Sequence, residues 1–160
     1  MLRPTLPTDT PALLAIATAT GVFKPHEIEA LEEVLDDYHD VNHTYGHQAH
    51  TWVEDGQVIG FVYFAPTAMT DRTWELWWIA VDPTRQGSGL GSRMLELVES
   101  AVLHETGRLL LIETSSTPLY EPTRRFYLRH DYVEAARIPD FYADGDGKVI
   151  FWKRLNPVVV

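Results

Sequence analysis

The chain has 160 residues, 45% of them hydrophobic and none of them cysteine, and its 13 basic and 23 acidic residues give a formal net charge of −10. We expect one folded domain over residues 1–160, located in the cytoplasm, without disulfides, thiolate metal sites or a cysteine nucleophile. The acidic surplus argues against nucleic acid and favours small cationic partners, and no run approaches the roughly 18 apolar residues that a membrane span needs.

The hydrophobic pattern predicts helices and strands in the order β-α-α-β-β-β-α-β-α-β-β. Asp55-Gly56 marks the turn of a hairpin, Thr10 is expected to cap the first helix, and Gly107 is expected to end the third. Residues 67–73 predict a plain loop. The predicted elements are strand 2–5, helix 10–20, helix 25–40, hairpin 47–67, strand 73–81, helix 90–106, strand 109–112, helix 121–130, and strands 132–138 and 148–155.

Three glycines, at positions 87, 89 and 91, separate a predicted strand from a predicted helix. A Walker loop is excluded, because Gly91 is followed by Ser92 and Arg93 rather than by Lys and then Ser or Thr. A dinucleotide fingerprint fits poorly, because the third glycine is misplaced and the next predicted strand, 109–112, contains no acidic residue. The N-terminus of a helix with glycines before it still favours binding of a pyrophosphate.

The spacing Gln86-x-x-Gly89-x-Gly91, preceded by IAVDP, resembles motif A of the GNAT superfamily of acetyl-CoA-dependent N-acetyltransferases, and RRFYLRHDYV resembles a second segment of that family. The resemblance implies a mixed α/β fold with a mostly antiparallel sheet of about seven strands and about four helices. It also implies acetyl-CoA as co-substrate, with no metal. The residues expected to bind the coenzyme are Ile79, Ala80, Val81, Gln86, Gly87, Ser88, Gly89, Leu90, Gly91, Ser92 and Tyr127.

Glu75 is the candidate general base for deprotonating an amine. Strand alternation places Glu75 on one face with Trp77, Ile79 and Val81, and burial on an apolar face raises the pKa of a carboxyl. The resemblance implies the same role, because some GNAT enzymes carry a catalytic glutamate at this position. A water chain or Glu113 is the alternative base, and a structural ion pair at Glu75 stays open.

Tyr127 is the candidate general acid, because a phenol is protonated at pH 7 and can donate to a thiolate. By resemblance, Tyr127 matches the family tyrosine that points at the coenzyme sulfur. The chain departs from the family pattern at Asp131, where glycine is usual, and at Tyr120, where asparagine is frequent. Aspartate tolerates the left-handed conformation better than most residues, so we expect the turn at Asp131 to form.

The resemblance predicts direct attack by a primary amine of a small molecule or peptide, in a ternary complex with acetyl-CoA. Neither nucleic acid nor membrane is expected as a partner, and a homodimer stays open because family members are commonly dimers. The alternatives are a non-catalytic acyl-CoA-binding module and a metal-binding protein built on the histidines at positions 39, 43, 47 and 50. Those histidines cross from a helix end into a strand, so their side chains need not converge.

Overall fold

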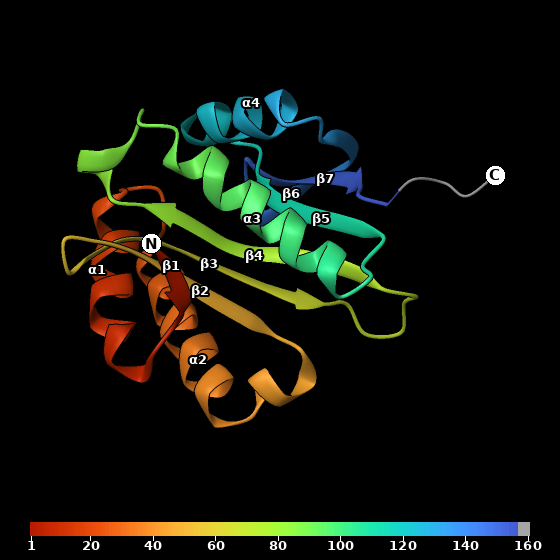
Figure 1. Ribbon diagram of the computed structural model, residues 1–160. Coiled ribbons are helices and arrows are strands. Elements are labelled where there is room, and N and C mark those ends of the chain that lie inside the picture. The colour runs from red at the N-terminus through yellow and green to blue at the C-terminus, as the bar shows by residue number, and fades with distance from the viewer. Residues whose placement is uncertain (157–160) are drawn as a thin grey trace. The chain divides into compact units, whose positions relative to one another are not determined.

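The computed structural model describes residues 1–156 (Figure 1). Seven strands form one sheet with the order β1-β2-β3-β4-β5-β7-β6. The chain divides into two compact units, one of residues 1–65 and 77–98 and the other of residues 66–76 and those from 99 onward. The elements are β1 (Leu2–Pro4), α1 (Thr10–Ala19), α2 (Pro25–Asp40), β2 (Gln48–Glu54), β3 (Gln57–Pro66), β4 (Thr73–Val81), α3 (Leu90–His104), β5 (Leu109–Ser115), α4 (Glu121–Arg129), β6 (Val133–Ala143) and β7 (Asp146–Arg154).

The sheet is mixed and mostly antiparallel, as predicted. β1–β2, β2–β3, β5–β7 and β6–β7 pair antiparallel, and β4–β5 pair parallel. The hairpin turns at the predicted residues, because Asp55 and Gly56 both adopt positive φ angles, of 50° and 75°. Two consecutive left-handed residues match the twist of the flanking strands, which explains why this dipeptide fixes the register.

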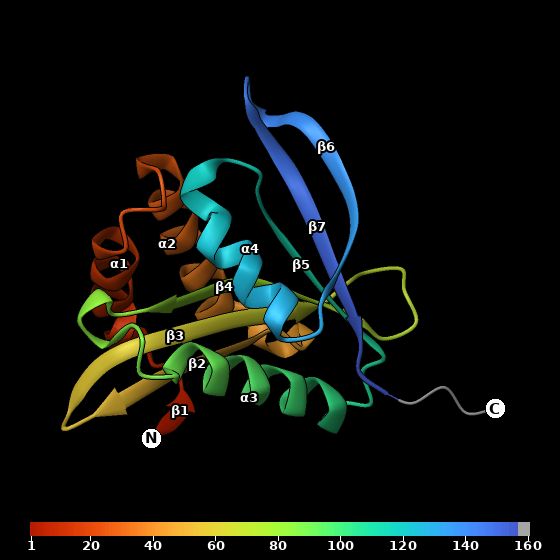
Figure 2. The same cartoon turned by 90° about the horizontal axis from the view of Figure 1, so that it is seen from above.

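In the first unit, α1 and α2 lie side by side (Figure 2) and bury their apolar faces. Leu31 and Leu35 of α2 are fully buried, whereas most acidic side chains of α2 are exposed. The predicted cap of α1 is wrong by one residue. Asp9 precedes the helix, where its carboxylate accepts a hydrogen bond from the Leu6 N–H at 2.8 Å and pairs with Arg3 at 2.6 Å.

In the second unit, the end of α3 also differs from the prediction. The helix ends at His104, and Thr106, not Gly107, takes the left-handed conformation, with φ at 59°. Gly107 is needed for close packing instead, because an added Cβ would lie 2.9 Å from the Trp74 ring and would overlap Val102. The sequence therefore marked a position where glycine is needed, but the reason is close packing and not the end of the helix.

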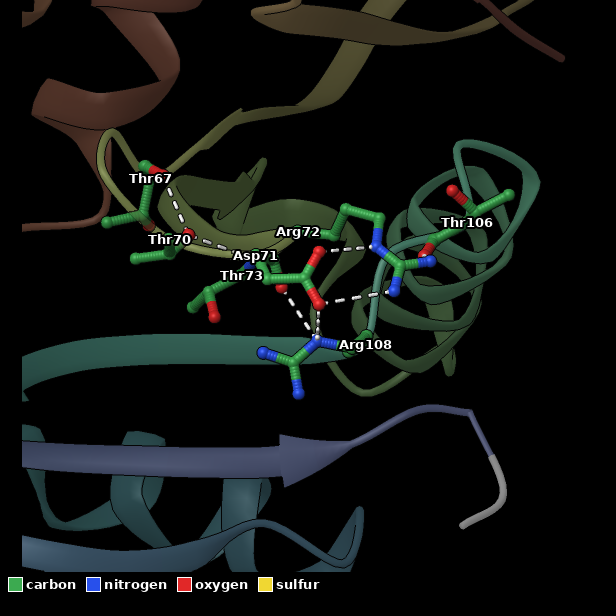
Figure 3. A network of polar contacts seen from close by, with 7 residues as sticks. All are labelled: Thr67, Thr70, Asp71, Arg72, Thr73, Thr106 and Arg108. Atoms are coloured by element: carbon green, nitrogen blue, oxygen red, sulfur yellow. Dashed lines mark hydrogen bonds and ion pairs between the residues drawn. The ribbon is translucent and has the colours of Figure 1, made fainter. Parts of the chain in front are cut away.

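Residues 67–72 connect β3 to β4 through a network of polar contacts and are not a plain loop (Figure 3). The Asp71 carboxylate pairs with Arg72 at 2.9 Å and with Arg108 at 3.3 Å. The Arg108 backbone N–H donates to the Arg72 carbonyl at 2.9 Å, and its Nε donates to the Asp71 carbonyl at 2.7 Å. These bonds join the residues that precede β4 and β5, where Thr73 pairs with Leu109.

Candidate active site

The glycine loop links a short 3-10 turn at Pro83–Arg85 to α3 and is exposed. Gly87 and Gly89 have φ angles of 82° and 79°, and an added Cβ at either would meet no atom within 4 Å. Glycine is therefore required there by the backbone conformation and not by lack of space. The first N–H groups of a helix have no intrahelical acceptor, so the start of α3 offers donors to a phosphate.

The approach to this loop is held by contacts within the first unit. The Asp82 carboxylate accepts bonds from the backbone N–H and hydroxyl of Thr84 at 2.9 and 2.8 Å, which lowers the pKa of Asp82. Arg85 pairs with Glu54 at 3.0 Å. At Gly60 of β3, a Cβ would lie 3.0 Å from the sulfur of Met94, so glycine there lets α3 pack close to the sheet.

The predicted alternation along β4 fails after Trp77. The Trp77 ring lies 5.3 Å from that of Tyr63, which belongs to the hydrophobic cluster beneath α1 and α2. Trp78 and Ala80 pack in that same cluster. Consecutive side chains on one face break the alternation of a regular strand, as a β-bulge does. The expected grouping of Trp77 with Ile79 and Val81 on one face is therefore wrong.

Glu75 is half-buried in the second unit, near a second carboxylate. Burial and the charge of Glu113 raise the pKa of Glu75 to about 6, and the charge of Lys148 opposes this. The Lys148 ammonium pairs with Glu113 at 2.8 Å and lies 3.9 Å from the centroid of the Phe141 ring. A carboxyl with a pKa near neutrality can exchange protons at physiological pH, which is what a general base requires.

Tyr127 is buried on α4 among aromatic side chains. Its ring lies 5.4 to 5.9 Å from the rings of Phe126, Tyr132 and Phe151. Burial raises the pKa of Tyr127, with a smaller contribution from Tyr120, so its hydroxyl stays protonated near neutral pH. The hydroxyl can therefore act as a proton donor.

The turn that follows α4 forms around Asp131, as predicted, with φ at 68°. The Tyr132 N–H donates to the Tyr127 carbonyl at 3.1 Å, and the Asp131 N–H donates to the Leu128 carbonyl at 3.2 Å. This pair of bonds is the Schellman motif, which usually has glycine at its left-handed position. The Tyr127 carbonyl is thus an acceptor in this turn, and Asp131 occupies the left-handed position where glycine is usual.

The family model described as an acetyltransferase (GNAT) domain matches residues 47–134. These residues are more than half of the chain and include the glycine loop, Glu75 and Tyr127. The chain belongs to the GNAT acetyltransferase family. The predicted family and enzyme class are therefore confirmed.

Solved structures agree with this assignment. A protein of the GNAT acetyltransferase family from Desulfovibrio desulfuricans is 36% identical, with a TM-score of 0.93 over 98% of this chain and 99% of that chain. An aminoglycoside 6′-N-acetyltransferase complexed with coenzyme A is 18% identical (TM-score 0.76, 100% and 99% covered), and the Escherichia coli ribosomal-protein-S18-alanine N-acetyltransferase is 17% identical (TM-score 0.80, 99% and 96% covered). These two similarities show the fold alone. A search of curated protein sequences found no match.

Three of the four clustered histidines of this GNAT acetyltransferase bond or stack with different groups, and His39 contacts the Tyr38 ring, as His43 also does. His43 hydrogen-bonds the Tyr38 carbonyl at 2.7 Å, His47 hydrogen-bonds the Tyr63 hydroxyl at 2.6 Å, and His50 stacks on Phe64. Among residues 1–156, no group of three or more His, Asp or Glu side chains is arranged to hold a metal ion. Within the same residues, no helix is both long enough and apolar enough to span a membrane.

Lys148 and Phe141 were not predicted as neighbours of the two carboxylates Glu75 and Glu113. Lys148 lies in β7, two residues after the buried Asp146, and faces Glu113 because β7 pairs antiparallel with β5. No local pattern marks this contact, because it depends on which strands become neighbours in the sheet. Only the lysine within a predicted strand, where an apolar residue is usual, could have drawn attention to the position.

Proposed function

We propose that this GNAT acetyltransferase moves an acetyl group from acetyl-CoA to a primary amine of a small molecule or peptide, by direct attack in a ternary complex. The proposal rests above all on the glycine loop, where Gly87 and Gly89 hold left-handed conformations before the 15-residue helix α3. The pyrophosphate would bind the backbone N–H groups of residues 86–92. By the family resemblance, the backbone of Ile79, Ala80 and Val81 would bind the pantetheine arm.

Glu75 takes the role of general base, acting through water. An amine with a pKa near 10.4 is neutral in roughly one molecule in a few thousand at pH 7, so attack on a thioester needs a proton acceptor. A carboxyl with a pKa of about 6 is mostly ionised at pH 7 and accepts a proton more readily than an ordinary glutamate. Glu113 is the alternative base, although its pairing with Lys148 favours a supporting role.

Tyr127 takes the role of general acid toward the leaving thiolate. Its buried hydroxyl keeps its proton at neutral pH and is therefore available to protonate the thiolate that leaves as coenzyme A. The C–S bond of the thioester breaks as the C–N bond forms, and the thiolate receives the phenolic proton. Because the chain has no cysteine, no cysteinyl intermediate can form.

The acceptor is proposed to be a cationic amine, since the chain carries a net charge of −10. The aminoglycoside and ribosomal-protein enzymes named above share the fold, which supports an amine as the acceptor class but does not choose between small molecules and peptides. The single domain, the cytoplasmic location and a homodimer stay predictions.

The test is coenzyme A release, followed with a thiol reagent across a panel of amines. The absence of cysteine makes the assay free of protein thiols. We expect E75Q to lower kcat at least about 100-fold and Y127F to lower it by a smaller factor, while both still bind acetyl-CoA. G89A should instead weaken acetyl-CoA binding, because alanine strains the left-handed backbone.

Two results would contradict this scheme. If no amine promotes thiol release although acetyl-CoA binds, the chain is the non-catalytic acyl-CoA-binding module. If E75Q and Y127F release thiol at the wild-type rate, the assigned roles of Glu75 and Tyr127 are wrong even though the family assignment holds.

A further inference from the structure

Trp77 is the most exposed tryptophan of the described chain, with 43% of its surface accessible. Burying a side chain of this size is usually among the most favourable packing contributions in a domain. An indole in a sheet strand that stays open to solvent is therefore available to a ligand, provided that its position is fixed.

Two rings fix Trp77 within the first unit. The Tyr63 ring lies 5.3 Å from it with an interplanar angle of 31°, so that one face of the indole rests on Tyr63. The His47 ring meets it edge-on, also at 5.3 Å. Tyr63 is itself fully buried and contacts the Tyr38 ring at 5.8 Å. We call Trp77, Tyr63 and His47 the aromatic platform.

The charges around the platform favour a cation. Burial, then Tyr38 and Asp37, raises the pKa of Tyr63, so its hydroxyl stays protonated; this hydroxyl and Nδ1 of His47 are hydrogen-bonded at 2.6 Å. Burial lowers the pKa of His47, so at neutral pH its ring is uncharged and does not repel a cation. Asp37 belongs to a helix whose exposed side carries further acids at positions 36 and 40.

We propose that the exposed face of Trp77 binds an ammonium group of the acceptor, so that preferred acceptors carry a second positive charge besides the nitrogen that is acetylated. The face of an aromatic ring attracts cations, and tryptophan does so most strongly. Trp77 follows the proposed base Glu75 by two residues in β4. The assignment of this ligand to the acceptor rests on the proposed acetyl transfer.

Binding is tested without catalysis, by titrating the protein with choline and with its uncharged carbon isostere, 3,3-dimethylbutan-1-ol. We expect choline to bind more tightly than the isostere, W77L to weaken choline about five- to tenfold, and W77F to weaken it about two- to threefold. The matched control is W152L, which removes an indole that is 38% exposed on β7 and should leave choline binding unchanged. If W77L does not fold, choline binding by W77F and W77Y is compared with that of the wild type instead, because both variants keep an aromatic face.

The link to acetyl transfer is tested by thiol release with 1,4-diaminobutane and with butylamine. We expect a higher kcat/KM for the diamine, and the diamine-to-butylamine ratio should fall in W77L but not in W152L. Equal affinity for choline and its isostere, or unchanged choline binding in the Trp77 variants, would overturn the cation site. Choline binding at Trp77 with no thiol release from any amine would leave the cation site standing and refute the acetyl transfer.

Discussion

Replacing Glu75 by glutamine should stabilise the fold at pH 8 while it removes the proposed base. In the folded protein, burial and the neighbouring Glu113 disfavour the charged form of Glu75. Glutamine has nearly the same shape as a protonated glutamate and carries no charge at any pH. The variant therefore avoids the cost of keeping an ionised carboxylate in this position.

The size of the gain follows from the difference between the ordinary pKa of 4.5 and the value of about 6 at Glu75. That difference corresponds to about 2 kcal/mol, and screening by water at a half-buried group reduces the expectation to about 1 to 2 kcal/mol. Because the folded-state pKa is raised, stability from the protonated form is fully present below pH 4.5 and is lost as the pH rises through 6. The advantage of E75Q should therefore grow from pH 5 to pH 8.

Urea denaturation of the wild type and E75Q at pH 5, 6.5 and 8 measures this advantage directly. A gain of 1 to 2 kcal/mol also corresponds to a rise in Tm of roughly 2 to 8 °C for a chain of this size. The control is E29Q, at an exposed position of α2, which should change stability by less than about 0.5 kcal/mol at every pH. Destabilisation by E75Q at pH 8, or an effect independent of pH, would refute the reasoning.

Two further predictions concern the groups around the site. Glu113 raises the pKa of Glu75 and Lys148 lowers it. E113Q should therefore lower the pH midpoint of the acidic limb of kcat/KM, and K148M should raise that midpoint. Shifts of both midpoints in the same direction would contradict this. D131G should stabilise the fold by about 0.5 to 1 kcal/mol, because glycine adopts the left-handed conformation of this position without strain. Urea denaturation measures the change. A loss of stability would show that the Asp131 side chain has a stabilising contact of its own.

The features that the sequence predicted correctly are those with local causes. The Asp55-Gly56 turn and the left-handed Asp131 follow from the conformational preferences of single residues. The order of helices and strands follows from apolar spacing. The glycine loop is recognisable from its three closely spaced glycines, and in the structure Gly87 and Gly89 take positive φ angles. Each of these signals lies within a few neighbouring residues.

The errors and omissions come from contacts between segments that are distant in sequence. Lys148 faces Glu113 only because β7 pairs with β5. Strict alternation in β4 was a sound expectation for an isolated strand, but Trp77 and Trp78 both contact the cluster beneath the first two helices. Gly107 marks a close approach of Trp74 and α3, and sequence alone cannot tell such an approach from a helix end.

The polar network around Asp71 makes the connection between β3 and β4 less free to vary than a surface loop usually is. Surface loops commonly tolerate insertions, because few contacts depend on their length. Here the Arg108 backbone bonds to the Arg72 carbonyl, and the first β4 residue pairs with Leu109 immediately afterwards. One residue inserted between Arg72 and Thr73, with the network kept, would shift the phase of β4 and turn the Glu75 carboxylate to the opposite face of the sheet.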